Sequence, residues 1–356
     1  MANTAPRFLF DVTKSRRQRH HSGLNRVSQK LLEHLSGRTD IDLRKVRWSV
    51  FRRSYIDVES RESIGRGTSS DRFFTPETFS FRERLFCESW MRRFRGTSAV
   101  VFHDAIPYFH PNTTWPKSVK RFPHWFRGLN LYDKVFFVSE QSRLDAANVS
   151  RGYVIEPITG PLFPLGGDYL TRKPVRNPSG KFTLVHVGII EPRKGHDVLL
   201  GACEELWSAG NDFKLVLLGR ANPHFGKGIL DRIEQLQSSG RDIIHEKSVR
   251  DDGLADWHSK ASLTVSPSRA EGFGLPVMES LWAGCPVVSS RQPCLEFLPT
   301  LKGVRVLEDI SVNSLVAAIR PLMEDYALLK ELSEEVAEAT LPTWDACVDN
   351  LLQELG

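Results

Sequence analysis

Hydrophobic and polar residues alternate in a regular way along most of the chain. Short hydrophobic runs of strand length are separated by longer segments with helical spacing, a pattern typical of parallel sheets joined by crossover helices. The runs are residues 7–12, 45–51, 99–102 and 135–138 in the first half, and 182–187, 214–218, 243–244, 262–266, 286–289 and 304–307 in the second. The sequence therefore predicts an α/β protein.

Two segments have the periodicity of amphipathic helices. The first carries hydrophobic residues three or four positions apart, followed by a glycine that favours a helix end: Leu24, Val27, Leu31, Leu32, Leu35 and Gly37. The second, residues 343–355, predicts a packed helix that ends the fold. Residues 52–80 are polar and rich in turn formers, so they predict a long loop.

The chain has 356 residues, more than one hydrophobic core usually supports. Proline and glycine, which break helices and strands, are frequent in residues 159–180. We therefore expect an N-terminal domain over residues 1–165, a linker over 166–180 and a C-terminal domain over 181–340. A terminal helix over 341–356 is expected to pack back toward the N-terminal domain.

Charge is distributed unequally between the two halves. Residues 1–172 hold 29 Lys and Arg against 17 Asp and Glu, a net charge of +12, whereas residues 173–356 hold 19 against 26, a net charge of −7. A basic half indicates an anionic partner such as a lipid headgroup surface, a lipid phosphate or nucleic acid, and a merely solvated basic surface explains it equally well.

The cysteines and the hydrophobic runs bear on the compartment. The five cysteines are odd in number and form no Cys-x-x-Cys pair, which argues against a disulfide framework and a cysteine zinc site. The first hydrophobic run is interrupted at once by Asp11, and no run approaches the length of a membrane-spanning helix. We expect a cytoplasmic protein, with peripheral contact to the cytoplasmic face of the membrane through the basic N-terminal domain as an option.

The segment from Glu271 to Glu279 carries the strongest chemical signal. Two carboxylates flank a glycine turn that follows a hydrophobic strand, and Pro276 stands where a first helical residue is expected. Backbone N–H groups at a helix start favour a phosphate, and Gly272 and Gly274 remove the side chains that would obstruct it. The spacing predicts a nucleotide-sugar site. A Gly-x-Gly-x-x-Gly fingerprint after the first strand and a P-loop are both absent, so dehydrogenase and P-loop chemistry are unsupported.

Three motifs in this chain together resemble a known family. They are residues 271–279, residues 187–195 (Val-Gly-Ile-Ile-Glu-Pro-Arg-Lys-Gly) and residues 102–107 (Phe-His-Asp-Ala-Ile-Pro). In this combination the chain resembles the retaining glycosyltransferases of family 4. The resemblance extends in order over nearly the whole chain, and includes the segment His21-Ser22-Gly23. It implies the GT-B fold, with two facing Rossmann-like domains, parallel sheets and a cleft between them.

The resemblance implies a role for each residue of the donor site. Glu279 would hydrogen-bond the ribose, and Glu271 would receive sugar hydroxyls. The backbone at Gly272, Phe273, Gly274 and Leu275 would meet the sugar or the diphosphate. Lys194 would neutralise the leaving diphosphate with the help of Arg193, because charge builds on that oxygen in the transition state. Simpler readings stay open, namely a helix-start charge for Glu279 and a solvated basic pair for Arg193 and Lys194.

Other residues complete the predicted site. His103 would contact the donor sugar, and Gly23 would let the phosphate and the acceptor approach the backbone. Many members have an arginine directly after the glycine of the second motif, but this chain has Ile189. The candidates to replace its charge are Arg193, Arg220 and Arg26. Base-reading groups are expected near Arg220 and in the loop that contains Val249.

The function that the resemblance implies is transfer of a sugar, with mannose or a related hexose preferred, from a GDP- or UDP-linked donor to a saccharide or lipid-linked acceptor. The reaction would retain the anomeric configuration, need no metal or other cofactor, and belong to bacterial surface polysaccharide synthesis. No nucleic-acid partner is expected. Three alternatives stay open: a sugar-nucleotide epimerase, a phosphorylase of the same fold, and a non-catalytic binding or scaffold subunit.

Overall fold

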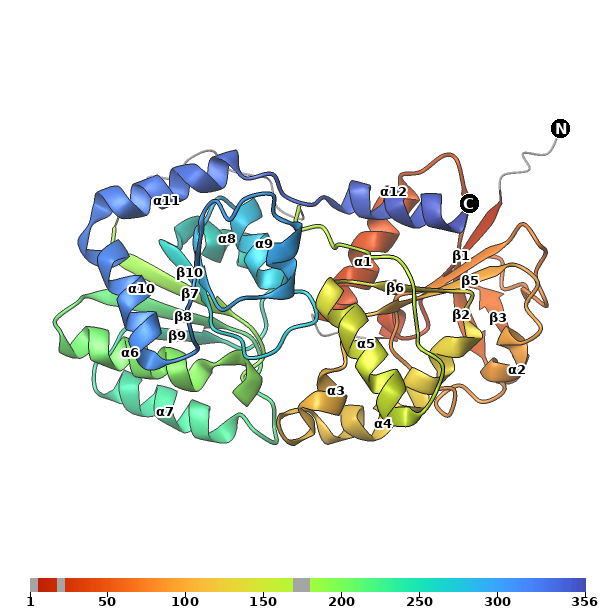
Figure 1. Cartoon of the computed structure of the whole chain (residues 1–356), viewed down its shortest axis with the longest axis horizontal. Helices are drawn as coiled ribbons and strands as arrows, with labels where there is room; N and C mark the ends of the chain where they lie inside the picture. Colours follow the sequence, from red (N-terminus) through yellow and green to blue (C-terminus); the bar gives the residue numbers. More distant parts are fainter. Residues whose placement is uncertain (1–5, 18–22, 169–179) are drawn as a thin grey trace. The chain divides into compact units, whose positions relative to one another are not determined.

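The computed structural model describes residues 6–17, 23–168 and 180–356. The chain forms two compact units (Figure 1). Unit 1 comprises Met1–Pro111, Pro116–Leu165 and Trp344–Gly356, and unit 2 comprises Asn112–Trp115 and Gly166–Thr343. Residues 169–179, most of the predicted linker, lie outside the described residues.

Unit 1 is built on a six-stranded sheet in the order β3-β2-β1-β4-β5-β6. All neighbours are parallel except β2 and β3, which form an antiparallel hairpin. The strands are β1 (Arg7–Asp11), β2 (Asp42–Ser49), β3 (Ser54–Asp57), β4 (Arg72–Thr75), β5 (Thr97–Phe102) and β6 (Lys134–Phe137). Buried strands in a parallel sheet need hydrophobic residues on both faces, which explains the continuous hydrophobic runs at β5 and β6.

The prediction of one long loop over residues 52–80 was wrong. This segment contains β3 and also β4, which lies in the middle of the sheet between β1 and β5. Only Phe73 and Phe74 are hydrophobic in β4, too short a run to identify a strand. The strand forms because both rings are fully buried, and because Asp71, just before it, pairs with Arg7 of β1 at 2.6 Å. Tertiary contacts here override a polar local sequence.

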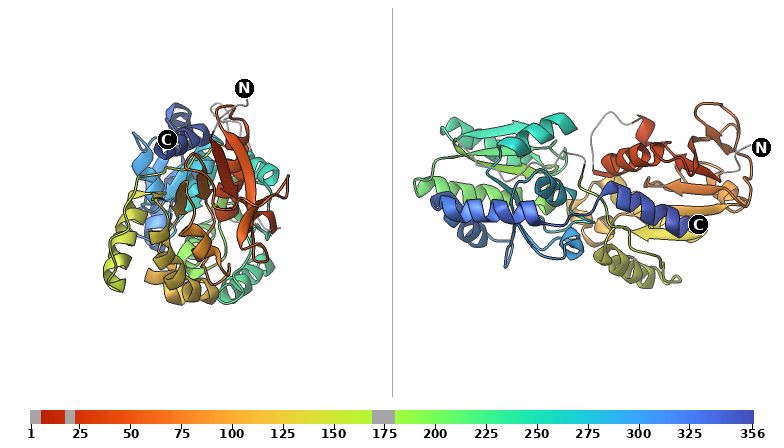
Figure 2. Two further views of the ribbon diagram at one scale, coloured as in Figure 1. Left: turned by 90° about the vertical axis from the view of Figure 1, so that its right-hand side faces the viewer. Right: turned by 90° about the horizontal axis from the view of Figure 1, so that it is seen from above.

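The helices of unit 1 flank this sheet. They are α1 (Gly23–Ser36), α2 (Cys87–Met91), α3 (Ile106–Phe109), α4 (Pro116–Gly128), α5 (Glu140–Tyr153) and α12 (Trp344–Leu355), with short 3₁₀ turns at Ser15–Arg17, Pro111–Thr113 and Leu129–Leu131. The apolar face of α1 is buried as its periodicity requires, through Val27, Leu31 and Leu35. The C-terminal helix α12 lies beside α1 (Figures 1 and 2), where His34 contacts Asp345 at 2.7 Å.

Unit 2 has a second six-stranded sheet, entirely parallel, in the order β12-β11-β10-β7-β8-β9. Its strands are β7 (Phe182–Val187), β8 (Phe213–Leu218), β9 (Ile243–Glu246), β10 (Leu263–Ser266), β11 (Val287–Ser289) and β12 (Val304–Val306). Its helices are α6 (His196–Ser208), α7 (Lys227–Ser238), α8 (Asp251–Lys260), α9 (Leu275–Trp282), α10 (Val312–Glu324) and α11 (Tyr326–Glu338), with 3₁₀ turns η4 (Pro192–Lys194) and η5 (Pro293–Phe297). In such sheets, ligands bind beyond the carboxyl ends of the strands.

Candidate functional site

The turn between β10 and α9 has the backbone that its glycines predict. Gly274 caps α9 with φ 112°, and a Cβ there would lie 2.5 Å from Oε1 of Gln292. The helix begins at Leu275, so Pro276 is its second residue and not its first, as we had predicted. Among the described residues, none accepts a hydrogen bond from the backbone N–H of Phe273, Gly274 or Leu275. These donors stand at the positive end of the helix dipole.

A buried cluster of charges adjoins this turn. The ammonium of Lys194, in η4 after β7, donates to Oε1 of Glu271. Arg193 donates from Nη1 to the other oxygen of Glu271 at 3.3 Å, and to the carbonyl of Ala270 at 2.9 Å. The Lys194 and Glu271 side chains are only 8% and 10% exposed. The structure thus brings together three of the predicted site residues, from segments 77 positions apart.

The charges in this cluster support one another. Burial raises the pKa of Glu271, but the positive charges of Lys194 and Arg193 outweigh it and lower that pKa to about 2. Burial lowers the pKa of Lys194, and the Glu271 carboxylate opposes that shift. The pair is therefore ionised at neutral pH, with one carboxylate facing two cations.

Four further residues fix the cluster in place, and the sequence alone gave them no role. Glu191 receives Arg193 Nε at 2.5 Å, and Asn222 donates to Glu191 at 3.1 Å. Arg269 pairs with Asp197 at 2.7 Å, and its backbone N–H donates to the carbonyl of Arg193. Glu191 lies within one of the quoted motifs, close in sequence to Arg193 and Lys194. Only the structure shows that it pairs with Arg193.

Two histidines are buried behind Lys194. The rings of His186 and His196 meet edge to face, with centroids 4.5 Å apart. His186 Nδ1 lies 2.8 Å from the carbonyl oxygen of Val265, so Nδ1 carries the proton and Nε2 is the acceptor. Burial lowers the pKa of His186 to about 4, although the bond to Val265 opposes this shift. Both rings are neutral at pH 7, which suits a position next to an ammonium group.

The remaining predicted donor residues occupy separate places in unit 2. Glu279 lies in α9, downstream of the glycine turn, and is buried. The Phe273 and Leu275 side chains are buried, so only their backbone can meet a ligand. Arg220 follows β8 and is exposed, with its carbonyl accepting from the N–H of Ile190. Val249 follows β9 and packs against the core around Leu254, an orientation that favours a structural role for its side chain.

His103 and Gly23 belong to unit 1, so they are described apart from this cluster. His103 directly follows β5, is buried, and its Nε2 lies 2.8 Å from the carbonyl oxygen of Pro76. Because a carbonyl only accepts, Nε2 carries the proton and Nδ1 is the acceptor. Burial lowers the pKa of His103, so the ring is neutral. Gly23 opens α1 in open space, and His21 and Ser22 of its motif lie outside the described residues.

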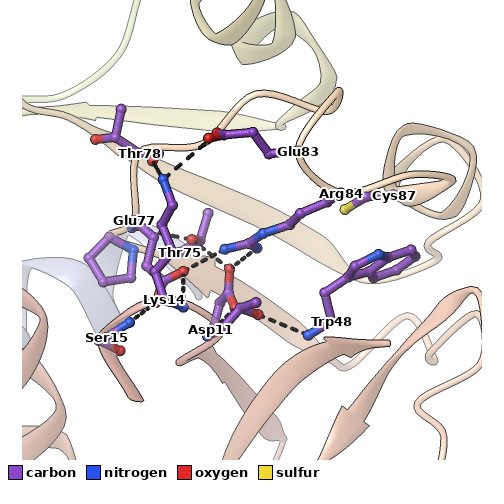
Figure 3. A network of polar contacts seen from close by, with 12 residues as sticks. Asp11, Lys14, Ser15, Trp48, Thr75, Glu77, Thr78, Glu83, Arg84 and Cys87 are labelled. Carbon is purple, nitrogen blue, oxygen red and sulfur yellow. Dashed lines mark hydrogen bonds and ion pairs between the residues drawn. The ribbon is translucent and has the colours of Figure 1, made fainter. Parts of the chain in front are cut away.

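A buried polar network occupies the carboxyl end of the unit 1 sheet (Figure 3). Arg84 donates from Nη1 to Asp11 at 2.5 Å and from Nη2 to Glu77. Asp11 ends β1, and Glu77 follows β4. All three side chains are at most 4% exposed. The sequence prediction missed this network; an aspartate that ends a hydrophobic strand was the only signal.

The network also holds the turn that follows β1. Glu77 accepts from the backbone N–H of Lys14 and from that of Ser15, each at 2.7 Å. Burial and the negative charge of Asp11 raise the pKa of Glu77 to about 7, against the opposing charge of Arg84. Burial lowers the pKa of Lys14 to about 8, and the nearby charge of Arg121 adds to this shift.

Two further observations concern metals and membranes. Across residues 6–17, 23–168 and 180–356, no three His, Cys, Asp or Glu side chains gather in a group that could hold a metal ion. Within the same ranges, no helix has the length and hydropathy needed to cross a bilayer.

Comparisons with known proteins agree with this architecture. Residues 170–339 match the family model for glycosyl transferases group 1. A serotype-specific mannosyltransferase of Escherichia coli is 26% identical over 217 residues, which are 56% of this chain and 26% of the relative. A D-inositol 3-phosphate glycosyltransferase of Catenulispora acidiphila is 33% identical over 161 residues, 43% of this chain and 38% of the relative. The chain thus spans about a quarter of the length of the mannosyltransferases it matches.

Solved structures resemble the chain over almost its whole length. The match to sucrose-phosphate synthase from Thermosynechococcus elongatus covers 97% of this chain and 97% of the synthase, with a TM-score of 0.69 and 17% identity. Anabaena HepE was solved in complex with UDP and glucose. Its match covers 98% of this chain and 99% of HepE, with a TM-score of 0.65 and 13% identity. Two Rossmann-like units with parallel sheets, as in these structures, form the GT-B fold. The chain thus has the GT-B fold, and its residues 170–339 are similar to the glycosyl transferases group 1.

Proposed function

We propose that this protein is a glycosyltransferase that moves mannose or a related hexose from a GDP- or UDP-linked donor to a saccharide or lipid-linked acceptor, with retention at the anomeric carbon and without a metal ion. One observation supports the proposal most. The buried Lys194–Glu271 pair adjoins a glycine turn whose backbone N–H groups stand at the start of α9. A cation, free backbone donors and a carboxylate are the groups that a sugar diphosphate requires.

Donor binding would divide the ion pair between two parts of the substrate. Phosphate oxygens accept from Lys194, Arg193 and the N–H groups of the turn, whereas sugar hydroxyls donate to Glu271. Without substrate, Lys194 and Glu271 neutralise each other. With the donor bound, each would instead make an oriented contact to it. As the glycosidic C–O bond breaks, negative charge grows on the departing diphosphate, so the fixed cations stabilise the transition state more than the ground state.

Other residues would bind the rest of the donor. Glu279 accepts hydrogen bonds from the ribose diol, and exposed Arg220 stands in for the arginine that Ile189 replaces. The backbone beside Val249 contacts the base. In unit 1, neutral His103 offers Nδ1 to a sugar hydroxyl, because Nε2 is engaged with Pro76.

The printed names of relatives guide the choice of substrates. Escherichia coli relatives are named serotype-specific mannosyltransferases, which supports mannose and a place in bacterial surface polysaccharide synthesis. Structures of similar fold were solved with UDP, among them the pneumococcal O-GlcNAc transferase GtfA. Both GDP and UDP donors therefore enter the test.

The test begins with thermal shifts of the purified chain against nucleoside diphosphates and their sugars, since a bound ligand raises the melting temperature by mass action. The best donor is then incubated with saccharide and lipid-linked acceptors in buffer that contains EDTA, and the anomeric configuration of the product is read by NMR. A product with the donor's configuration supports the proposal, and an inverted product or full loss with EDTA contradicts it.

Matched variants assign the chemistry to the site. Lys194→Met should abolish transfer, whereas Lys227→Ala, which removes an exposed lysine of α7, should not change it. Full activity in Lys194→Met would overturn the assignment. An isomerised sugar without acceptor would indicate an epimerase, and turnover that depends on phosphate would indicate a phosphorylase. Donor binding with no turnover on any acceptor would indicate a binding subunit.

A further inference from the structure

Two loops of unit 1 expose large hydrophobic side chains. Val50 and Phe51 form the turn of the β2–β3 hairpin, and Leu85 and Phe86 directly precede α2. Phe51 is 101% exposed, Leu85 58%, Phe86 48% and Val50 40%. Single exposed hydrophobic residues are common, but four in two loops that touch form a patch of the kind that marks an interaction site. We call these two loops the hairpin face.

The hairpin face is held together by defined contacts. The guanidinium of Arg53 lies 4.4 Å from the centroid of the Phe86 ring, which joins the two loops. Arg52 donates from Nη1 to the carbonyl of Arg61 at 2.9 Å. Arg84, directly before Leu85, and Cys87, directly after Phe86, are both buried and anchor the loop (Figure 3). The hydrophobic side chains therefore project from a fixed base.

Backbone conformation reinforces this picture. Among the described residues other than glycine, four have positive φ, and three of them belong to this region: Arg53 at 48°, Arg61 at 62° and Phe86 at 67°. A left-handed conformation costs a residue with a Cβ about 1 kcal/mol or more. Arg53 and Phe86 are also the two residues whose contact joins the loops, so two of these left-handed residues belong to the hairpin face itself.

Positive charge surrounds the hydrophobic side chains. Five exposed arginines lie in the hairpin turn, just before Leu85 or just after α2: Arg52, Arg53, Arg82, Arg92 and Arg93. The exposed acids of the same segments and of α2 are Glu83 and Glu88. The net charge is therefore +3, so the surface favours an anionic partner.

The position of the hairpin face links it to the unit 1 site. Strand β2 runs parallel to β1, with Val46 beside Asp11, so its carboxyl end and the Val50–Phe51 turn lie at the same edge of the sheet as Asp11. The carboxyl end of β5, which leads to His103, belongs to that edge as well, because β4 and β5 are also parallel to β1. The face therefore borders the polar network and not the opposite end of the unit.

We propose that the hairpin face docks on an anionic lipid bilayer, with Phe51, Leu85 and Phe86 entering the interfacial region and the arginines contacting lipid phosphates. A bilayer surface offers both an apolar phase and negative charge, and each nearby arginine contributes about 1 kcal/mol on anionic lipid. A second copy of the chain would oppose its own positive rim. Nucleic acid would match the arginines but leave Val50 and Leu85 without apolar partners.

Docking in this orientation would bring the carboxyl edge of the unit 1 sheet close to the lipid headgroups. A lipid-linked acceptor could then reach that edge without leaving the membrane. The inference rests on surface residues and is independent of the donor chemistry proposed for unit 2.

The test is co-sedimentation of the full chain with vesicles of phosphatidylcholine alone or of phosphatidylcholine with 30% phosphatidylglycerol. Binding is expected only on the anionic vesicles and should weaken as salt rises. The double variant Phe51→Ser/Leu85→Ser should bind about tenfold more weakly, since it removes two inserting side chains. The matched control is Val154→Ser, which removes a side chain that is 91% exposed on unit 1 outside the hairpin face.

Nucleotide thermal shifts of the same variants separate this inference from the proposed function, because unchanged donor binding shows that unit 2 is intact. Loss of vesicle binding in Phe51→Ser/Leu85→Ser with the control unaffected supports the inference. No binding by the wild type, equal binding by both variants, concentration-dependent dimers that the double variant abolishes, or a preference for bulk RNA over vesicles would each overturn it.

Discussion

Lys194 and Glu271 form an ion pair in which neither side chain is more than 10% exposed. Removing two charges from water costs several kcal/mol per ion, and their attraction often only balances that cost. A buried pair therefore contributes little net stability compared with a well-packed apolar pair. Its presence beside a glycine turn is better explained by a ligand that uses both charges.

This relationship predicts a strongly non-additive mutant cycle. Glu271→Gln should destabilise the protein by about 3–5 kcal/mol, because it leaves the buried Lys194 ammonium without its partner, and Lys194→Met should cost less, because Arg193 still pairs with Glu271. The double variant should be less destabilised than the sum of the two single variants, since neither charge remains. Urea unfolding of the four proteins measures the interaction energy.

The matched cycle uses the exposed pair Lys227 and Asp231 of α7, where the coupling should be within a few tenths of a kcal/mol. Strictly additive effects at Lys194 and Glu271, with the same energies as the exposed pair, would show that the two charges are not coupled as a buried ion pair.

Gly274 should tolerate no side chain. Alanine there would combine a positive φ of 112° with a Cβ 2.5 Å from Gln292 Oε1 and 2.8 Å from Cys294 Sγ. We expect Gly274→Ala to lower stability by roughly 2 kcal/mol and to weaken nucleotide binding, because the N–H groups at the start of α9 would shift. Thermal unfolding and donor titration check both effects.

Gly228 supplies the control. It lies near the start of α7, and a Cβ there meets nothing within 4 Å. Alanine at this helical position should be neutral or stabilising by up to about 1 kcal/mol. If Gly274→Ala were as benign as Gly228→Ala, the turn would not be constrained as its geometry indicates.

Much of the fold could be predicted because its information is local. Strands such as β7 and β8 are mostly hydrophobic, and α1 carries a clear helical stripe. Strand β4 could not be predicted, since its stability comes from neighbours that bury Phe73 and Phe74. The exposure of Phe51 was missed for the opposite reason: hydrophobic character suggested a strand end where the structure has a turn.

The candidate site shows the same division. Glycine spacing and the Arg193-Lys194 dipeptide are visible in the sequence, so those positions could be named, and their roles stay predictions. The partners Glu191 and Asn222, and the network of Asp11, Glu77 and Arg84, arise where separate strand ends converge. Neither periodicity nor spacing in the sequence predicts that these residues come together, because the order of the strands in the sheet brings them into contact.

His186 should make the protein sensitive to mild acid. Its pKa is lowered to about 4 by burial, so between pH 6.5 and 4 the unfolded chain binds a proton that the folded protein does not. Stability from this group should fall as pH decreases through that window, by at most about 3 kcal/mol. His186→Gln should flatten this part of the stability profile, measured by urea unfolding at several pH values. An unchanged slope would contradict the neutral buried ring.

Glu77 should impose the opposite dependence on pH. Its pKa is raised to about 7 by burial and Asp11, so between pH 4.5 and 7 the folded protein binds a proton that the unfolded chain has released. Stability from this group should therefore decline as pH rises through that window. Glu77→Gln, which keeps the shape and cannot ionise, should remove this decline, and urea unfolding from pH 4.5 to 8 measures it.

Glu83 provides the control for Glu77, because it lies in the same region and its pKa is lowered. Burial raises that pKa, but the backbone N–H of Ser80 and the charge of Lys14 outweigh the effect. Its contribution is present above pH 4.5 and is lost below it, so Glu83→Gln should leave the slope between pH 5 and 7 unchanged. A slope that responds to Glu83→Gln and not to Glu77→Gln would show that Glu77 is not the group with the raised pKa. In that case, the carboxylate that accepts from Lys14 and Ser15 in the turn after β1 would not titrate in this range.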